Sequence, residues 1–194
     1  MGQGFMLFET AIGRCGLAWG AGGLIGVQLP EAAPGAAWAR LRKRYPDAKE
    51  TAPPPEVDEA ADRIIDLLAG NPGGGRDDLS DVALDLTVVQ PFNRRVYEIA
   101  RAIRPGETST YGQVAKAMGE PGAMRAVGKA LGENPWPIVV PCHRVLGADG
   151  KIGGFSADGG ATTKARLLTI ERARVTDVPT LFDMDFSVAP PKGR

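Results

Sequence analysis

Apolar and polar residues alternate in three stretches near the start of the chain: Phe5 to Thr10, Cys15 to Trp19 and Leu24 to Leu29. Alternation with a period of two is typical of strands with one buried face. Gly13 and the run from Gly20 to Gly23 separate the stretches and favour tight turns. The pattern therefore predicts a small antiparallel sheet.

The region after this sheet predicts two helices and one further strand. Residues 36–44 predict a short helix with a basic end, and residues 49–55 a proline-rich connection. Residues 56–69 predict a second helix, whose first turn is acidic and therefore favourable for the helix dipole. A glycine-rich stretch that includes residues 73–75 ends this helix. Alternation of apolar and polar residues over 81–87 predicts another strand. We expect an α/β first half with a structural role.

Beyond residue 91 the pattern changes to helical spacing. Phe92, Val96, Ile99 and Ile103 recur every three or four residues and place one apolar stripe on a helix. A capping box at residues 110–113 predicts the start of a second helix, and residues 123–132 predict a third. The last two helices are typical of a helix-turn-helix, although an ordinary pair of packed helices gives the same pattern. We expect domains at 1–88 and 89–175, followed by a tail at 176–194.

An apolar run bounded by prolines then leads to a cysteine beside a histidine. Residues 138–140 are β-branched and predict a short buried strand or extended segment, and Cys142 and His143 follow directly. A thiol with a pKa of about 8.5 is only a few per cent thiolate near neutrality, so a nucleophile needs a base or a positive charge nearby. His143, the only histidine, is the candidate base, and Arg144 is the candidate charge. A lone cysteine in an apolar run is also a common core residue.

Composition narrows the class of protein. The chain has 194 residues, of which 43% are hydrophobic and 24% charged, as in ordinary globular proteins. It has no apolar run near the roughly 20 residues of a membrane span and no signal-peptide pattern, so we expect a cytoplasmic protein without a membrane segment. Its two cysteines, Cys15 and Cys142, indicate no disulfide framework. With a single histidine they also fall short of a structural zinc site, and we expect no metal and no cofactor.

Charge is distributed unevenly along the chain, although the net charge is zero. Residues 45–90 hold 11 acids against 3 bases, a net charge of −8, whereas residues 91–144 hold 8 bases against 4 acids, a net charge of +4. The basic half carries the cysteine. This clustering is a weak indication of a nucleic-acid face, and a solvated surface is the alternative.

The string Pro141-Cys142-His143-Arg144, with Asn134-Pro upstream and Gly153-Gly154-Phe155-Ser156 downstream, resembles the active-site signature of the O6-alkylguanine-DNA alkyltransferases. These are also called methylated-DNA–protein-cysteine methyltransferases. The resemblance extends from about residue 91 to residue 173 and includes two segments similar to the DNA-binding helices of the family, 110–115 and 125–131. It implies a ribonuclease-H-like first domain and a mainly α, winged-helix-like second domain.

The resemblance also implies direct-reversal DNA repair. An alkyl group, typically methyl, would pass irreversibly from O6 of guanine to Cys142, once per molecule, after the base has been flipped out through the minor groove. O4 of thymine is a further candidate substrate. The expected partner is double-stranded DNA that contains O6-alkylguanine, and we expect the protein to be a monomer.

Individual roles follow from the same resemblance. Four residues would be catalytic: Cys142 as nucleophile, His143 as base acting through a water, Glu171 as the group that orients it, and Asn134 as a hinge. The substrate would be bound by Tyr111 at N3, by Ser156 at O6, by the carbonyls of Cys142 and Val145 at the exocyclic amine, and by Phe155, Pro137 and Lys164. Arg125 would fill the gap left by the flipped base. The other residues expected to bind DNA are Ala123, Ala126, Lys129 and Thr110. Ala130 is a further small residue expected to let the helix approach the groove.

Two departures from the family pattern stand out. Phe155 replaces a tyrosine found in many relatives, and the loop over residues 156–163 is about two residues longer than usual. Other functions fit the sequence less well. A lesion-binding protein without transfer activity would lack the cysteine, and a cysteine hydrolase would need a distant histidine. A P-loop is excluded because residues 122–129 have the wrong spacing and no following Ser or Thr.

Overall fold

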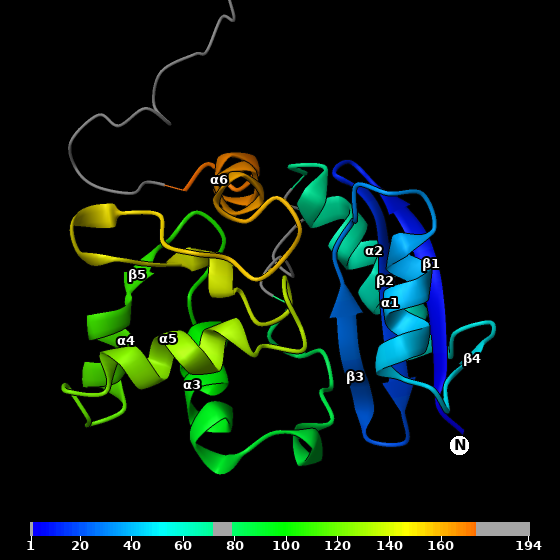
Figure 1. Cartoon of the computed structure of the whole chain (residues 1–194), viewed down its shortest axis with the longest axis horizontal. Helices are drawn as coiled ribbons and strands as arrows, with labels where there is room; N and C mark the ends of the chain where they lie inside the picture. Colours follow the sequence, from blue (N-terminus) through cyan, green and yellow to red (C-terminus); the bar gives the residue numbers. More distant parts are fainter. Residues whose placement is uncertain (1, 72–78, 174–194) are drawn as a thin grey trace, which may run out of the picture.

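The structure is a computed structural model and describes residues 2–71 and 79–173. The glycine run at 73–75 and the expected tail at 176–194 lie outside the described residues. The described elements form two groups that lie side by side, a sheet with two helices and a mainly helical part, and a final helix lies along one end of both (Figure 1).

The first group is built on a sheet with the strand order β3-β2-β1-β4. The strands β1 (Gly4–Thr10), β2 (Gly13–Gly20) and β3 (Gly23–Gln28) pair antiparallel, which confirms the predicted meander. The edge strand β4 (Lys49–Glu50) pairs parallel with β1 inside the segment predicted as a connection, so the sheet is mixed. Two residues are too short to show a period, and β4 forms because the chain leaving the first helix passes the free edge of β1.

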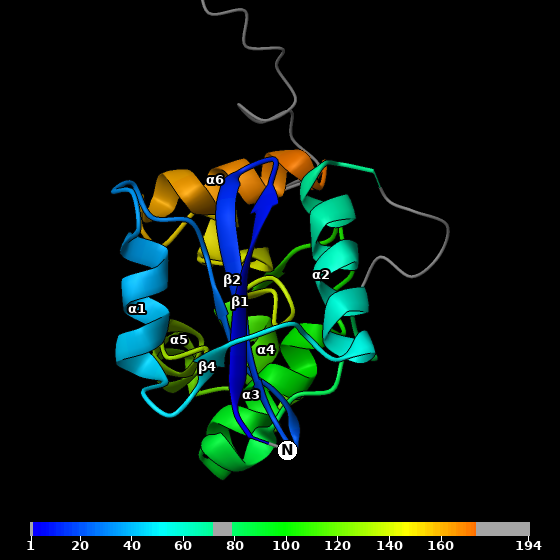
Figure 2. The ribbon, with the colours of Figure 1, turned by 90° about the vertical axis from the view of Figure 1, so that its right-hand side faces the viewer.

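Two helices cover opposite faces of this sheet, α1 (Ala36–Arg44) and α2 (Pro55–Leu68) (Figure 2). Strand β2 is therefore buried on both sides. Leu17 belongs to the large core cluster, whereas its neighbour Ala18 packs with Leu41 of α1. Both helices match their predicted ranges to within one residue.

The strand predicted over residues 81–87 is wrong. Leu84 makes one isolated bridge with Leu24, and a 3-10 turn, η1 (Leu86–Val88), follows. The alternation is real, since Val82 and Leu84 are buried. The ladder stops at Asp85, because its carboxylate accepts a hydrogen bond from the backbone of Thr87 at 3.1 Å and so favours a turn.

The second group contains the helices α3 (Pro91–Arg101), α4 (Tyr111–Ala117), α5 (Met124–Gly132) and α6 (Ala161–Ile170). The capping box of α4 is present, with both reciprocal hydrogen bonds between Thr110 and Gln113. A short parallel pair joins β5 (Ser109–Thr110) to β6 (Val145–Leu146), and two 3-10 turns are η2 (Cys142–Arg144) and η3 (Ala148–Gly150). The three helices predicted between residues 91 and 132 are therefore confirmed.

The two groups share one buried cluster. The indole of Trp136 donates to the carbonyl of Leu24 at 2.8 Å, and the amide of Val27 donates to the carbonyl of Pro135 at 2.8 Å. The loop before Cys142 is thus fixed directly to β3. None of the helices in residues 2–71 and 79–173 has the length and apolar character needed to cross a membrane.

Candidate active site

The loop from Asn134 to Cys142 is a series of tight turns, and the prediction of a strand or extended segment over residues 138–140 is wrong. The amide of Val140 donates to Trp136 at 2.7 Å, and the amide of Cys142 donates to Val140 at 2.8 Å. Ile138 has a φ of 76°, which is rare for a β-branched residue and costs on the order of 1–3 kcal/mol. The apolar side chains are buried as predicted, but they fill a compact turn that places Cys142 at the start of η2.

Asn134 organises this loop from inside. Its amide nitrogen Nδ2 donates to the carbonyl of Val140 at 2.8 Å and to Sγ of Cys142 at 3.3 Å. Its Oδ1 accepts from the backbone of Trp136 at 2.9 Å. All three contacts are buried, so this one side chain sets both the course of the loop and the position of the thiol.

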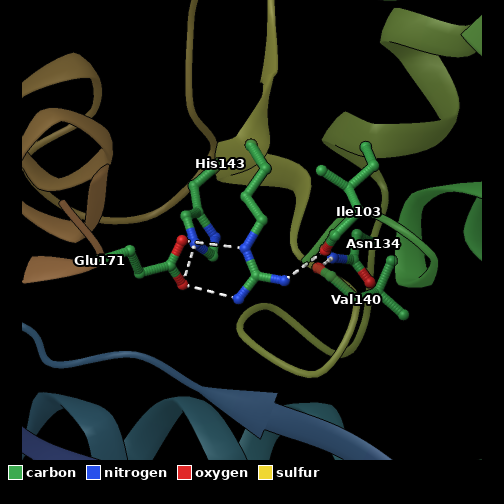
Figure 3. Close-up of polar contacts among 6 residues, drawn as sticks. Ile103, Asn134, Val140, His143 and Glu171 are labelled. Carbon is green, nitrogen blue, oxygen red and sulfur yellow. Dashed lines mark hydrogen bonds and ion pairs between the residues drawn. The ribbon is translucent and has the colours of Figure 1, made fainter. Parts of the chain in front are cut away.

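His143, Arg144 and Glu171 form a buried polar network (Figure 3). Nε2 of His143 lies 2.9 Å from Oε1 of Glu171. Arg144 donates to both oxygens of Glu171, at 2.9 and 2.7 Å, and to the carbonyl of Ile103 at 2.6 Å. Arg144 therefore neutralises Glu171, and the idea that it supplies charge to Cys142 is wrong.

Burial and neighbouring groups together determine the protonation states of Cys142, His143 and Glu171. Burial raises the pKa of the Cys142 thiol, and the hydrogen bond from Asn134 and the charge of Lys164 offset this only in part. Burial also lowers the pKa of His143, against the opposing effect of Glu171. For Glu171 burial favours the protonated form, but the charges and hydrogen bonds of His143 and Arg144 prevail and lower its pKa to about 2. Near neutrality the thiol is protonated, the imidazole neutral and the carboxylate ionised.

These states fix the tautomer of His143. The carboxylate of Glu171 only accepts hydrogen bonds, so Nε2 carries the proton and Nδ1 is left with a lone pair. Nδ1 is buried and has no hydrogen-bond partner among the described residues. The arrangement leaves a lone pair on the imidazole of His143, the residue that directly follows Cys142 in the chain.

Lys164 lies near the thiol of Cys142 and contacts Val145. The buried Nζ of Lys164 donates to the carbonyl of Val145 at 2.6 Å and lies 5.8 Å from the centre of the Tyr111 ring. Burial lowers the pKa of Lys164, whereas the nearby Cys142 raises it. Lys164 therefore supplies the positive charge near Cys142 that the sequence led us to expect from Arg144.

A cavity of about 80 Å³ opens at Cys142. One wall is formed by residues expected at the site: Asn134, Pro137, Phe155 and Ser156, with Ala157. The other wall comes from the first group of elements: Val27, Gln28, Leu29, Arg40 and Arg44. The sequence analysis missed this second wall and took the first half as structural; the basic end of α1 was the one signal available.

A second cavity lies on the helix pair. It is lined by Thr110, Tyr111, Gly112, Met124, Arg125, Gly128 and Ala148. Arg125, Ala126 and Lys129 are exposed on α5, and Ala123 is half-buried at its start. Ala130 is 1% exposed, so it cannot be one of the small residues that would approach DNA. Met124, which the sequence analysis did not select, is 51% exposed beside Arg125.

The expected site residues thus fall into four groups. Cys142, Asn134, Pro137, Phe155 and Ser156 meet at the first cavity, and His143 and Glu171 form the network behind it. Tyr111, Thr110 and Arg125 meet at the second cavity, and Lys164 and Val145 lie close to Tyr111 and the thiol. No group of three or more His, Cys, Asp or Glu side chains that could hold a metal ion occurs within residues 2–71 and 79–173.

Known proteins are similar in sequence to the part of the chain that carries this site. Residues 91–173 match the model of the 6-O-methylguanine DNA methyltransferase, DNA binding domain. A methylated-DNA–protein-cysteine methyltransferase of Mycolicibacterium paratuberculosis is 50% identical over 103 residues, which cover 53% of this chain and 61% of that protein. The chain thus spans less than two thirds of this relative. One from Shigella flexneri is 39% identical over 139 residues, which cover 60% of this chain and 80% of that protein.

Solved structures extend the similarity to the first half of the chain. The crystal structure of the Mycobacterium tuberculosis O6-methylguanine methyltransferase aligns with a TM-score of 0.67 and 34% identity, over 88% of this chain and 93% of that one. The structure of the Mycobacterium tuberculosis protein in complex with DNA has the same TM-score and identity, over 87% and 92% of the two chains. The two-part arrangement, the network behind Cys142 and these similarities lead to one conclusion: this chain belongs to the methylated-DNA–protein-cysteine methyltransferase family.

Proposed function

We propose that this protein repairs alkylated DNA by transferring the alkyl group from O6 of guanine to Sγ of Cys142, once per molecule. The observation that carries the proposal is the state of His143. Its Nε2 is held by an ionised carboxylate, its buried Nδ1 has no partner among the described residues, and the adjacent residue is a thiol at the wall of a cavity. We assign no residue to removal of the alkyl group from the product thioether, so each protein molecule reacts once and is consumed.

The first step is removal of the thiol proton. Burial holds Cys142 in the neutral form, so a thiolate has to be generated when the substrate is present. Nδ1 of His143 accepts the proton, through a water as relay, and Glu171 stabilises the imidazolium that results. Asn134 and Lys164 stabilise the thiolate, because each favours the ionised form of Cys142.

The thiolate then attacks the alkyl carbon on the side opposite O6. The S–C bond forms as the C–O6 bond breaks, and guanine leaves with the electron pair. Negative charge then develops on guanine. We assign its stabilisation to Tyr111, which donates to N3, and to Ser156, which donates to O6. The carbonyl of Val145 keeps a lone pair for the exocyclic amine, since Lys164 occupies only one.

Recognition is assigned to α5. The helix would enter the minor groove, with Arg125 in the place of the flipped base and the small side chains of Ala123 and Ala126 allowing close approach. Lys129 and the N-terminal end of α4 at Thr110 would contact phosphates. The exposure of Arg125, Ala126 and Lys129 supports this assignment.

The finer parts of the architecture are proposed in the same way. The sheet with α1 and α2 would be the ribonuclease-H-like domain, over residues 1–88, and the helical part up to residue 175 the winged-helix-like domain. We place the protein in the cytoplasm as a monomer, with O4 of thymine as a second substrate atom.

The test is a mass measurement. The protein is incubated with a duplex that contains one O6-methylguanine, and the intact protein and its peptides are weighed. A gain of one methyl group on Cys142, never exceeding one equivalent, is expected. Cys142→Ala should gain nothing, whereas Cys15→Ala should react as the wild type does, because burial raises the pKa of Cys15 to about 11 and it lies outside the site. Tight binding to the lesion without a gain in mass would overturn the proposal in favour of damage sensing.

A further inference from the structure

The cavity at Cys142 is lined by residues assigned to the flipped base, Phe155 and Ser156, but it extends past them. Its volume of about 80 Å³ reaches from Cys142 to the residues contributed by α1. This is the side on which a group attached to the reacting carbon would extend. Such a group would run from Cys142, between Pro137 and Ala157, toward α1 of the sheet domain.

The wall contributed by α1 is cationic. Arg40 and Arg44 both line the cavity, and residues four apart on a helix share one face. Arg40 pairs with Glu31 at 3.1 Å. Arg44 is exposed, lies 5.6 Å from the centre of the Tyr45 ring, and has no carboxylate within ion-pair distance among the described residues.

The rest of the lining does not neutralise this charge. The other polar side chains on the cavity are those of Gln28, Asn134, Ser156 and Cys142, none of which is ionised near neutrality. Gln28 is itself buried and donates to Glu31 at 2.9 Å, which holds that carboxylate on its partner Arg40. One guanidinium, that of Arg44, is left for a ligand.

We propose that this end of the cavity is a subsite for the carboxylate of an O6-alkyl group that ends in an acid. The substrate class is guanine in DNA that carries a carboxyalkyl group on O6, and the inference rests on the proposed transfer to Cys142. Arginine suits the role because its planar guanidinium binds a carboxylate through two parallel hydrogen bonds.

The reaction balances without another reactant. The Cys142 thiolate forms a bond to the methylene carbon, the bond from that carbon to O6 breaks, and its electron pair leaves with guanine, which then takes up one proton. The product is an S-carboxyalkyl cysteine. A carboxylate near the thiolate repels it, and this repulsion falls as the negative charge of the carboxylate is paired with Arg44.

The test compares an acid with a neutral group of the same shape. Single-turnover rates are measured with duplexes that contain O6-carboxymethylguanine or its amide, O6-carbamoylmethylguanine, and then with the 3-carboxypropyl group and its amide. With the wild type we expect the acid to react about tenfold faster than the amide for at least one of the two lengths. In the variant Arg44→Gln this ratio should fall to about one.

Arg42→Gln is the matched control. Arg42 is on the same helix and equally exposed, but its guanidinium lies over Trp38, at 5.4 Å, away from the cavity. This variant should keep the wild-type ratio of acid to amide. The same ratio in the wild type and Arg44→Gln, or an equal fall in Arg42→Gln, would overturn the subsite. Absence of transfer even from O6-methylguanine would instead overturn the proposed function.

Discussion

Two arginines of this protein, Arg144 and Arg125, occupy opposite environments. Arg144 is 1% exposed and makes hydrogen bonds to both oxygens of Glu171 and to a backbone carbonyl. Arg125 is exposed on α5 and has no hydrogen bond or ion pair with any other described residue. The groups assigned to the chemistry are therefore ordered without DNA, whereas those assigned to recognition are left free to bind it.

The contrast also predicts where substitutions act. Removing one member of the buried network leaves a charge without compensation, which costs folding free energy as well as activity. Removing an exposed cation on α5 costs only contacts made with DNA. Substitutions and acid can test this difference, and we expect the largest effect at Glu171.

Glu171→Gln should have the largest effect, because it leaves the buried charge of Arg144 unpaired. We expect a loss of about 3–5 kcal/mol in the free energy of unfolding, measured by urea denaturation. Glu98→Gln is the control, since Glu98 pairs with Arg94 at 3.0 Å on an exposed face of α3 and should cost less than about 0.5 kcal/mol. Equal losses in the two variants would contradict the special role of burial.

Acid should weaken the fold through the same carboxylate. The pKa of Glu171 is about 2 in the folded protein and 4.5 as an ordinary group, so the unfolded chain takes up the proton first. Stability is then lost as the pH falls from about 4.5 toward 2, by about 3 kcal/mol in total. The measurement is the difference in unfolding free energy between the wild type and Glu171→Gln at pH 7 and pH 3. A difference that does not shrink at pH 3 would count against the assignment.

His143→Gln should slow transfer about 100-fold while leaving lesion binding intact, because it removes the base but keeps a donor to Glu171. The remaining rate should rise with pH more steeply than that of the wild type, since the thiolate then forms without a base. Single-turnover rates between pH 6 and pH 9 test this. A variant with a wild-type rate at pH 7 would exclude His143 as the base.

Arg125→Ala should slow transfer about tenfold in duplex DNA and little in single-stranded DNA, because only the duplex requires a base to be extruded. Arg94→Ala, which removes an exposed arginine on α3, serves as the control. Comparable losses on both kinds of DNA would show that Arg125 contributes charge alone and does not assist extrusion.

Lys129→Gln should have the smallest effect, a loss of roughly threefold in duplex affinity at moderate salt, because one phosphate contact is removed. The slope of log affinity against log salt should fall by about one. Fluorescence anisotropy at several salt concentrations measures both. An unchanged slope would remove Lys129 from the interface and leave it to its ion pair with Glu133, at 3.8 Å.

Most helices and the three-stranded meander were predictable, because each carries a clear period and a terminal signal. The capping box at Thr110 is an example, since two residues three apart satisfy each other's backbone. The failures occurred where long-range contacts decide the conformation. β4 exists only because β1 lies beside it, and Ile138 adopts a positive φ because the anchored indole of Trp136 and Asn134 dictate the turn.

The candidate site was predictable to the extent that it lies within one continuous motif. Cys142, His143 and Asn134 are close in sequence, and the resemblance supplied Glu171. The actual partner of Arg144 and the cationic wall formed by Arg40 and Arg44 required the structure. Residues separated by about a hundred positions meet at this cavity, and no local pattern records such a contact.

The hydrogen bond from the Val27 amide to the Pro135 carbonyl makes it possible to measure motion between the two halves of the protein. The Val27 amide points away from its partner strand β2 and is protected by the active-site loop. Its hydrogen–deuterium exchange therefore measures how often that loop separates from the sheet, while neighbouring amides within the β2–β3 ladder measure opening of the sheet itself. Comparing the two rates before and after alkylation of Cys142 would follow, at a single backbone position, whether the spent protein loosens at the junction of its two halves.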